Sequence, residues 1–224
     1  MGTGITFKRP DGTEAQGYLS LAWHGEAPGV VVIQEWWGLQ DQVKGVCDRL
    51  ALAGFSALAP DLYRGTVVPY HDHDAAAKAM NGLDFIDATS QTVRGAASFL
   101  GRSGAKVGIV GFCMGGAVAV IGAAKVQELS AAIAYYGLPP AQAAAPADVH
   151  VPLLGHFANH DDWCGPAVVD AFESGLKAAG KEFEFHRYDA SHAFANEQRA
   201  QVHDRHAAEQ AWQRTVEFLS RTLA

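Results

Sequence analysis

The chain has 224 residues, 49% of them hydrophobic, and a formal net charge of -7. This length can bury one sizeable core, so we expect a single domain over residues 1–224. The negative charge offers no field to attract nucleic acid or an anionic membrane, and no apolar stretch approaches the roughly 20 residues of a membrane helix. The first residues lack the charged-then-apolar build of a secretory signal, so we expect a cytoplasmic protein, either a monomer or a small homo-oligomer.

Three cysteines, Cys47, Cys113 and Cys164, form an odd set without the spacing of a disulfide framework or of a CxxC motif. Such a set fits a reducing compartment, in which thiols stay free. Most free cysteines are small buried hydrophobes, so a chemical role for any of the three needs support from its surroundings.

The first stretch of the chain predicts a β-hairpin at the edge of a sheet. Residues 5–9 ("ITFKR") and 17–23 ("GYLSLAW") are rich in β-branched and aromatic residues, and the segment between them contains the turn sequence Pro-Asp-Gly. After this hairpin, predicted strands alternate with predicted helices. The strands are residues 29–34, 55–60, 106–112, 129–137, 151–158 and 181–188, and the helices are 40–53, 75–80, 84–100, 113–125, 166–179 and 202–223.

Several of these strands, such as "GVVVIQ" at 29–34, are continuous apolar runs without polar alternation. Such runs are typical of strands that are buried on both faces. The alternation of strands and helices then predicts an α/β protein with a mostly parallel central sheet flanked by helices on both faces. In a sheet of this kind, ligands bind beyond the carboxyl ends of the strands.

The segment "GFCMGG" places Cys113 between a predicted strand and a predicted helix. Its GxCxG pattern is a form of the nucleophile elbow, a tight turn in which glycines make room for the crossing chain and the nucleophile stands at the mouth of the sheet. The start of the following helix favours a thiolate at this place. We therefore predict that Cys113 is a catalytic nucleophile.

A nucleophile of this kind needs a base and a carboxylate that orients the base. In "DASHAF", His192 follows the last predicted strand and is the candidate base. In "ANHDDW", the carboxylate is either Asp161 or Asp162, of which we favour Asp161. The order along the chain, nucleophile then acid then histidine, is the order of the α/β-hydrolases.

The segment "QEWWG" places Glu35 directly after an apolar strand and before two tryptophans. A carboxyl group there is partly desolvated, which raises its pKa and equips it to exchange a proton with a thiol. The backbone N–H groups of Trp36 and Met114 are candidates for an oxyanion hole.

With these motifs in place, the chain resembles the dienelactone hydrolase family, the carboxymethylenebutenolidases, within the α/β-hydrolase fold. The resemblance is carried by "IQEWWGL", "APDLYRG", "VGIVGFCMGG", "AAIAYYG", "HFANHDDW" and "YDASHAFAN", in the order of the family and nearly from end to end.

The resemblance implies a triad of Cys113, Asp161 and His192, with Glu35 as a modulator that takes the proton of the thiol when substrate arrives. The cysteine then attacks an ester or lactone, forms an acyl enzyme and is released by water, with no cofactor and no metal.

Two arginines that grip the carboxylate of dienelactone in the family are replaced here. Their positions correspond to Asn196 and to the stretch from His71 to Asp74. A guanidinium fork is not replaced by an amide or an imidazole, so the sequence argues against dienelactone itself as the substrate. We expect Trp36, Tyr63, His71 and Asn196 to face a small ester or lactone substrate.

Three alternatives remain open at this stage. A general carboxylesterase or thioesterase would use the same nucleophile. A non-catalytic binding or redox-sensing protein could retain Cys113 as a reactive thiol. Residues 71–74 ("HDHD") and 159–162 ("NHDD") could bind metal, although no zinc motif imposes a geometry on them.

Overall fold

The computed structural model describes residues 1–23 and 26–224. Eight strands in this part of the chain form one sheet. Its strand order is β1-β2-β4-β3-β5-β6-β7-β8. The strands are β1 (Thr3–Lys8), β2 (Glu14–Ser20), β3 (Gly29–Ile33), β4 (Ser56–Pro60), β5 (Val107–Phe112), β6 (Ala131–Tyr135), β7 (Leu153–His160) and β8 (Phe183–Ser191). β1 and β2 form an antiparallel hairpin at one edge, and all neighbours from β4 to β8 are parallel. The predicted α/β-hydrolase architecture is confirmed, including its N-terminal hairpin.

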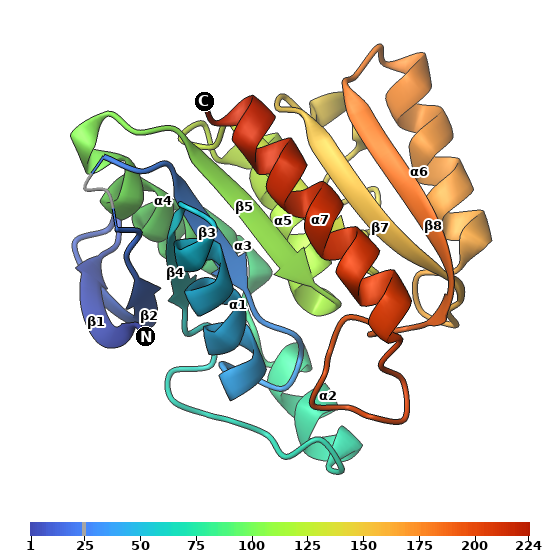
Figure 1. Ribbon diagram of the computed structural model, residues 1–224, viewed down its shortest axis with the longest axis horizontal. Coiled ribbons are helices and arrows are strands. Elements are labelled where there is room, and N and C mark those ends of the chain that lie inside the picture. The colour runs from blue at the N-terminus through green and yellow to red at the C-terminus, as the bar shows by residue number, and fades with distance from the viewer. Residues whose placement is uncertain (24–25) are drawn as a thin grey trace.

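Helices cover both faces of the sheet, as Figure 1 shows. The α-helices are α1 (Asp41–Leu52), α2 (His73–Asn81), α3 (Phe85–Asp87), α4 (Arg94–Leu100), α5 (Met114–Lys125), α6 (Pro166–Ala178) and α7 (Arg205–Thr222). Side chains of α4, α5 and α6 join the core on one face, and side chains of α1 and α7 join the core on the other. No helix in the described part of the chain is both long and apolar enough to span a bilayer.

The central strands contribute to both cores because their successive side chains point to opposite faces. In β3, Val31 and Ile33 pack on the α4–α5 side, while Val30 and Val32 pack on the α1–α7 side. All four are fully buried. Each such side chain adds about 1.5–3 kcal/mol of hydrophobic stabilisation when it leaves water.

Two helices differ from their predicted extents. The predicted helix 84–100 is interrupted by a π-helical segment, η1 (Ala88–Val93), between α3 and α4. Periodicity alone does not show such a widened turn, because its apolar residues still meet the core. The predicted start of the last helix at residue 202 moves to Arg205, because the Asp204 side chain accepts a hydrogen bond from the Ala207 N–H and caps the helix there.

A buried polar network attaches α7 to the sheet. His156 on β7 is fully buried, and its ring nitrogens lie 2.8 Å from the Tyr188 hydroxyl and 3.1 Å from the Thr215 hydroxyl. Burial, together with His186 and Arg214 nearby, holds the pKa of His156 well below its ordinary value. The neutral form is therefore the one that the fold stabilises.

We expect the contribution of His156 to the free energy of unfolding to fall as the pH drops below about 6.5, where histidine in the unfolded chain takes up a proton and His156 in the fold does not. The contribution of one such histidine is about 1.4 kcal/mol per pH unit until its folded pKa is reached. Urea unfolding at pH 7.5 and 5.5 measures it. His156→Gln should be less stable at pH 7.5 but lose less stability on acidification.

The matched control is His206→Gln, because His206 is exposed on α7, the helix that the His156 network attaches to the sheet. It should retain the pH dependence of the wild type. An unchanged pH dependence in His156→Gln would contradict the assignment.

Candidate active site

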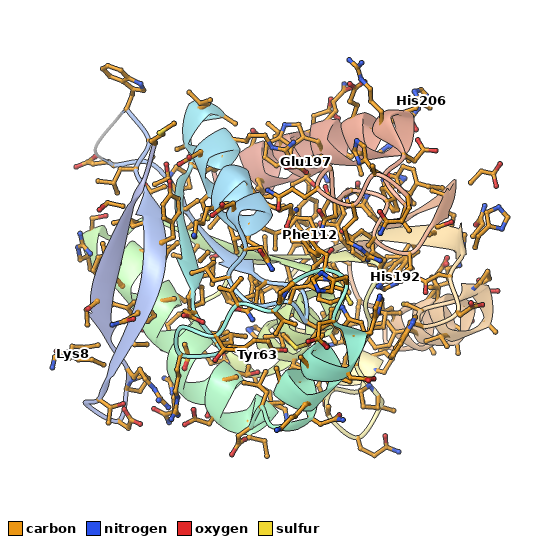
Figure 2. All side chains as sticks on the ribbon, turned by 90° about the horizontal axis from the view of Figure 1, so that it is seen from below. Lys8, Tyr63, Phe112, His192, Glu197 and His206 are labelled. Atoms are coloured by element: carbon orange, nitrogen blue, oxygen red, sulfur yellow. The ribbon has the colours of Figure 1, made fainter. Side chains whose placement is uncertain are left out.

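The carboxyl ends of neighbouring strands place five polar side chains at one edge of the sheet. Cys113 directly follows β5, Tyr136 follows β6, Asp161 follows β7 and His192 follows β8, while Glu35 lies two residues beyond β3. Because these strands are adjacent and parallel, residues far apart in the sequence meet there. Seen from below, His192 lies towards the middle of this side of the molecule (Figure 2).

Cys113 has the strained backbone of a nucleophile elbow. Its φ of 55° and ψ of -118° lie in a region that non-glycine residues rarely adopt. The turn is closed so tightly that a Cβ on Gly111 would lie 1.8 Å from the carbonyl oxygen of Gly115. Glycine is therefore required at residue 111, and the turn presents the Cys113 side chain at the start of α5.

His192 is held by a buried carboxylate. Its Nδ1 lies 2.7 Å from Oδ2 of Asp161, whose side chain is completely buried. The other oxygen, Oδ1, accepts hydrogen bonds from the backbone N–H groups of Trp163 and Cys164 at 2.8 and 2.9 Å. Asp161 rather than Asp162 thus orients the imidazole, while Asp162 lines the neighbouring cavity.

The electrostatics of this pair favour a charged imidazole. Burial by itself would lower the pKa of His192, but the hydrogen bonds with Asp161 and with the Cys113 side chain outweigh it and raise that pKa to about 10. Burial would likewise raise the pKa of Asp161, yet its hydrogen bonds from His192 and from the backbone lower it. His192 is therefore hydrogen-bonded to a carboxylate and lies close enough to the Cys113 thiol for that group to raise its pKa.

Glu35 is a second buried carboxyl group of the site, at 2% exposure. Tyr136 Oη donates to Oε1 at 3.1 Å, and Asn196 Nδ2 donates to Oε2 at 3.0 Å. Burial raises the pKa of Glu35, and these two donors together with the nearby His192 and Arg199 oppose that rise. The hydrogen bonds of Glu35 thus go to Tyr136 and Asn196, whereas Cys113 pairs with His192.

A cavity of about 460 Å³ opens beside Cys113. Cys113, His192 and Glu35 lie in its wall, and the proposed oxyanion residues Trp36 and Met114 line it as well. Small-molecule sites typically have such a volume and such a mixture of apolar walls and a few polar groups.

Three residues predicted to face substrate lie elsewhere. Asn196 is fully buried and turned towards Glu35, because a buried carboxylate needs donors. Tyr63 is also buried, and its hydroxyl lies 3.3 Å from Sδ of Met114. His71 is exposed before α2, and His73, two residues further on, lines the cavity in its place.

The alternative of a metal site gains no geometry from the structure. Across residues 1–23 and 26–224, no three histidine, cysteine, aspartate or glutamate side chains are arranged to hold a metal ion.

Two residues of the site were missed by the reasoning from sequence. Tyr136 is fully buried with a φ of 39°, and its ring centroid lies 5.2 Å from that of His192. Its position directly after a strand in "AAIAYYG" was the available signal. Arg199 lines the cavity with its guanidinium 5.5 Å from the Trp37 ring, and its buried Nε has no hydrogen-bond partner among the described residues.

Comparison with known proteins identifies the family. The family model described as "Dienelactone hydrolase family" matches residues 16–223. The chain belongs to the dienelactone hydrolase family. It is therefore a hydrolase of esters or lactones, as the resemblance implied.

Relatives of this dienelactone hydrolase family member extend over the whole chain. It is 34% identical to "Protein usf" from Aquifex pyrophilus, with 100% of both chains covered. It is 32% identical to a putative carboxymethylenebutenolidase from Escherichia coli K12 over 87% of this chain and 77% of the relative. A crystal structure of a putative dienelactone hydrolase from Klebsiella pneumoniae superposes with a TM-score of 0.85 at 26% identity, covering 98% and 99% of the two chains.

The raised pKa of Glu35 gives a stability prediction. When a carboxyl group holds its proton more tightly in the fold than in the unfolded chain, its contribution to the free energy of unfolding falls as the pH rises above its unfolded pKa of about 4.3. Glu35→Gln should remove this loss, by about 1.4 kcal/mol for each unit of the pKa shift. Urea unfolding at pH 5 and pH 8 should show that the variant gains stability relative to the wild type at the higher pH.

Glu197→Gln is the matched control, because Glu197 is exposed in the loop that also carries Asn196. It should keep the pH dependence of the wild type. If Glu35→Gln also kept that dependence, the carboxyl group at residue 35 would have its ordinary proton affinity in the fold.

Proposed function

We propose that this protein hydrolyses a small ester or lactone through Cys113 as nucleophile, with His192 as base and Asp161 as the carboxylate that orients it. The observation that carries the proposal is the position of His192, which is hydrogen-bonded to a fully buried carboxylate and lies close enough to a thiol on a strained turn for that thiol to raise its pKa. Burying a charged pair costs desolvation free energy, so such a pair is weak evidence for a stabilising role. Pairs of this kind cluster at functional sites.

The chemistry follows from the positions of these groups. In the attacking state the proton of the Cys113 thiol lies on His192, whose charged form the site favours, and the thiolate sulfur attacks the carbonyl carbon of the ester. The carbonyl oxygen becomes an oxyanion, for which we assign the backbone N–H groups of Trp36 and Met114 as donors. The N–H of Met114 is available because this residue begins α5 and has no acceptor within the helix.

Collapse of this intermediate breaks the bond between the carbonyl carbon and the alcohol oxygen. His192 returns its proton to the departing alkoxide, and a thioester remains on Cys113. A water molecule then gives a proton to His192 while its oxygen attacks the thioester. Collapse of this second intermediate breaks the bond between the carbonyl carbon and sulfur, the acid is released, and the proton on His192 returns to the sulfur.

We assign Glu35 the modulating role. Its enclosed carboxyl group lies close enough to His192 for their charges to interact, and burial raises its pKa, which suits it to exchange a proton with a thiol. Tyr136 and Asn196 would hold it in place through their hydrogen bonds.

We further infer a single domain that acts on a small molecule in the cytoplasm, without a cofactor and without nucleic acid. Free thiols at all three cysteines and the negative net charge support this inference.

Cys113→Ala and His192→Ala should each lower kcat by roughly 10³-fold or more, since members of such a triad act as one unit. The assay is hydrolysis of p-nitrophenyl acetate and of a small lactone, with circular dichroism to confirm folding. Mass spectrometry of the wild type with slow substrates should show an acyl group on Cys113. The control is Cys47→Ala, since Cys47 is a fully buried residue of α1 and burial raises the pKa of its thiol.

Equal turnover by the wild type and both triad variants would overturn the sulfur mechanism. Failure of the folded wild type to hydrolyse any ester or lactone would favour the binding or redox-sensing alternative instead.

Arg199 adds a permanent positive charge to the cavity wall. We expect it to favour esters with a free carboxylate, since hydrogen bonds between charged groups contribute more than those between neutral ones. Monoethyl succinate and its neutral amide, ethyl succinamate, differ mainly in that charge. Arg199→Gln should lower kcat/KM for the succinate about tenfold or more and change the succinamate little.

Arg205→Gln serves as the control for this comparison, because Arg205 is exposed at the start of α7. Equal losses on both esters in Arg199→Gln would show that Arg199 supports the fold of the loop and does not select charge.

A further inference from the structure

Trp163 is a large aromatic side chain that the mechanism does not use. It is 69% exposed, although it lies in the wall of the cavity above Cys113. Trp37, by contrast, is 1% exposed and packs in a small core with Val68 and Ala76. Trp163 therefore contributes little to the core, and its exposed ring is available to a bound molecule.

The catalytic machinery fixes the position of Trp163. Its backbone N–H donates to Oδ1 of Asp161, the carboxylate that holds His192. Its ring lies 5.5 Å from the ring of Trp36, tilted by 64°, and Trp36 lies 5.8 Å from the ring of His73. Trp36, His73 and Trp163, which come from three different parts of the chain, form what we call the aromatic wall.

Other parts of the cavity have a different chemistry. His160, Asp162 and Ser191, from the ends of β7 and β8, supply polar groups, while Met80 and Leu138 add apolar surface. The aromatic wall is thus one apolar side of a cavity whose remaining lining is mixed. Its edge-to-face geometry leaves ring faces that a further aromatic group can meet at the usual centroid separations of about 4.5–7 Å.

We propose that the aromatic wall binds an aromatic group of the ester substrate and that Trp163 sets the preference for such a group. This inference rests on the proposed function, because it names the class of ester that the same site accepts. Trp163 acts here as a specificity-determining residue and takes no part in proton transfer or bond cleavage.

The test compares esters that differ only in aromaticity. Ethyl phenylacetate and ethyl cyclohexylacetate carry the ring on the acyl side, benzyl acetate and cyclohexylmethyl acetate carry it on the alcohol side, and ethyl acetate carries none. We expect Trp163→Ala to lower kcat/KM about tenfold for at least one of the two aromatic esters, from the loss of ring contacts. The matching saturated ester should lose less, and ethyl acetate should change little.

Two further variants make the result specific. Trp163→Phe keeps a ring and should retain the aromatic preference to within about threefold. Trp23→Ala removes another exposed tryptophan, 92% exposed and outside the cavity, and should leave every ratio unchanged.

An equal loss on all five esters in Trp163→Ala would overturn the proposal, because it would show that the residue only supports Asp161. Unchanged aromatic-to-saturated ratios in both pairs would overturn it as well. Cys113→Ala, assayed on ethyl acetate, separates this result from the proposed function. If this variant hydrolysed ethyl acetate as fast as the wild type, the sulfur nucleophile would be refuted, whatever aromatic-to-saturated ratios the Trp163 variants gave.

Discussion

The turn that carries Cys113 is the constraint on which the rest of the site depends. The residue holds a positive φ, a conformation that costs on the order of 1–3 kcal/mol and persists only where the surroundings fix it. Those surroundings are β5, fully buried between two neighbours, and a crossing chain so close that a Cβ on Gly137 would lie 1.9 Å from the Cys113 carbonyl oxygen. The burial of the central strands thus offsets the strain at Cys113.

The second feature of the site is that both of its buried carboxyl groups accept several hydrogen bonds. Asp161 receives three, from His192 and from two backbone N–H groups, and Glu35 receives two, from Tyr136 and Asn196. With these partners a carboxyl group can remain at the edge of an apolar sheet, where an unpaired charge would be strongly unfavourable. The same hydrogen bonds fix the orientation of His192 and Glu35, so that satisfying the buried polar groups also orders the side chains to which we assign catalytic roles.

Much of the fold could be predicted because the strands are continuous apolar runs and the turn residues between them are distinctive. Site residues could be predicted where they directly follow a strand, and Cys113, Asp161 and His192 all do so. The side-chain directions were not predictable. Asn196 was expected to face substrate, but it turns inward to Glu35, and no local pattern indicates which buried carboxyl group a loop amide will meet.

The sequence by itself determined the order of strands and helices, the glycine-lined turn at Cys113 and the set of polar residues at the strand ends. These follow from short-range rules, since side-chain periodicity and glycine backbone freedom act within a few residues. Only the tertiary structure decided that Tyr136 and Asn196 hold Glu35, and that Arg199, His73 and Trp163 line the cavity. Those contacts join residues up to 161 positions apart, and they exist only when the parallel strands bring their carboxyl ends to one edge.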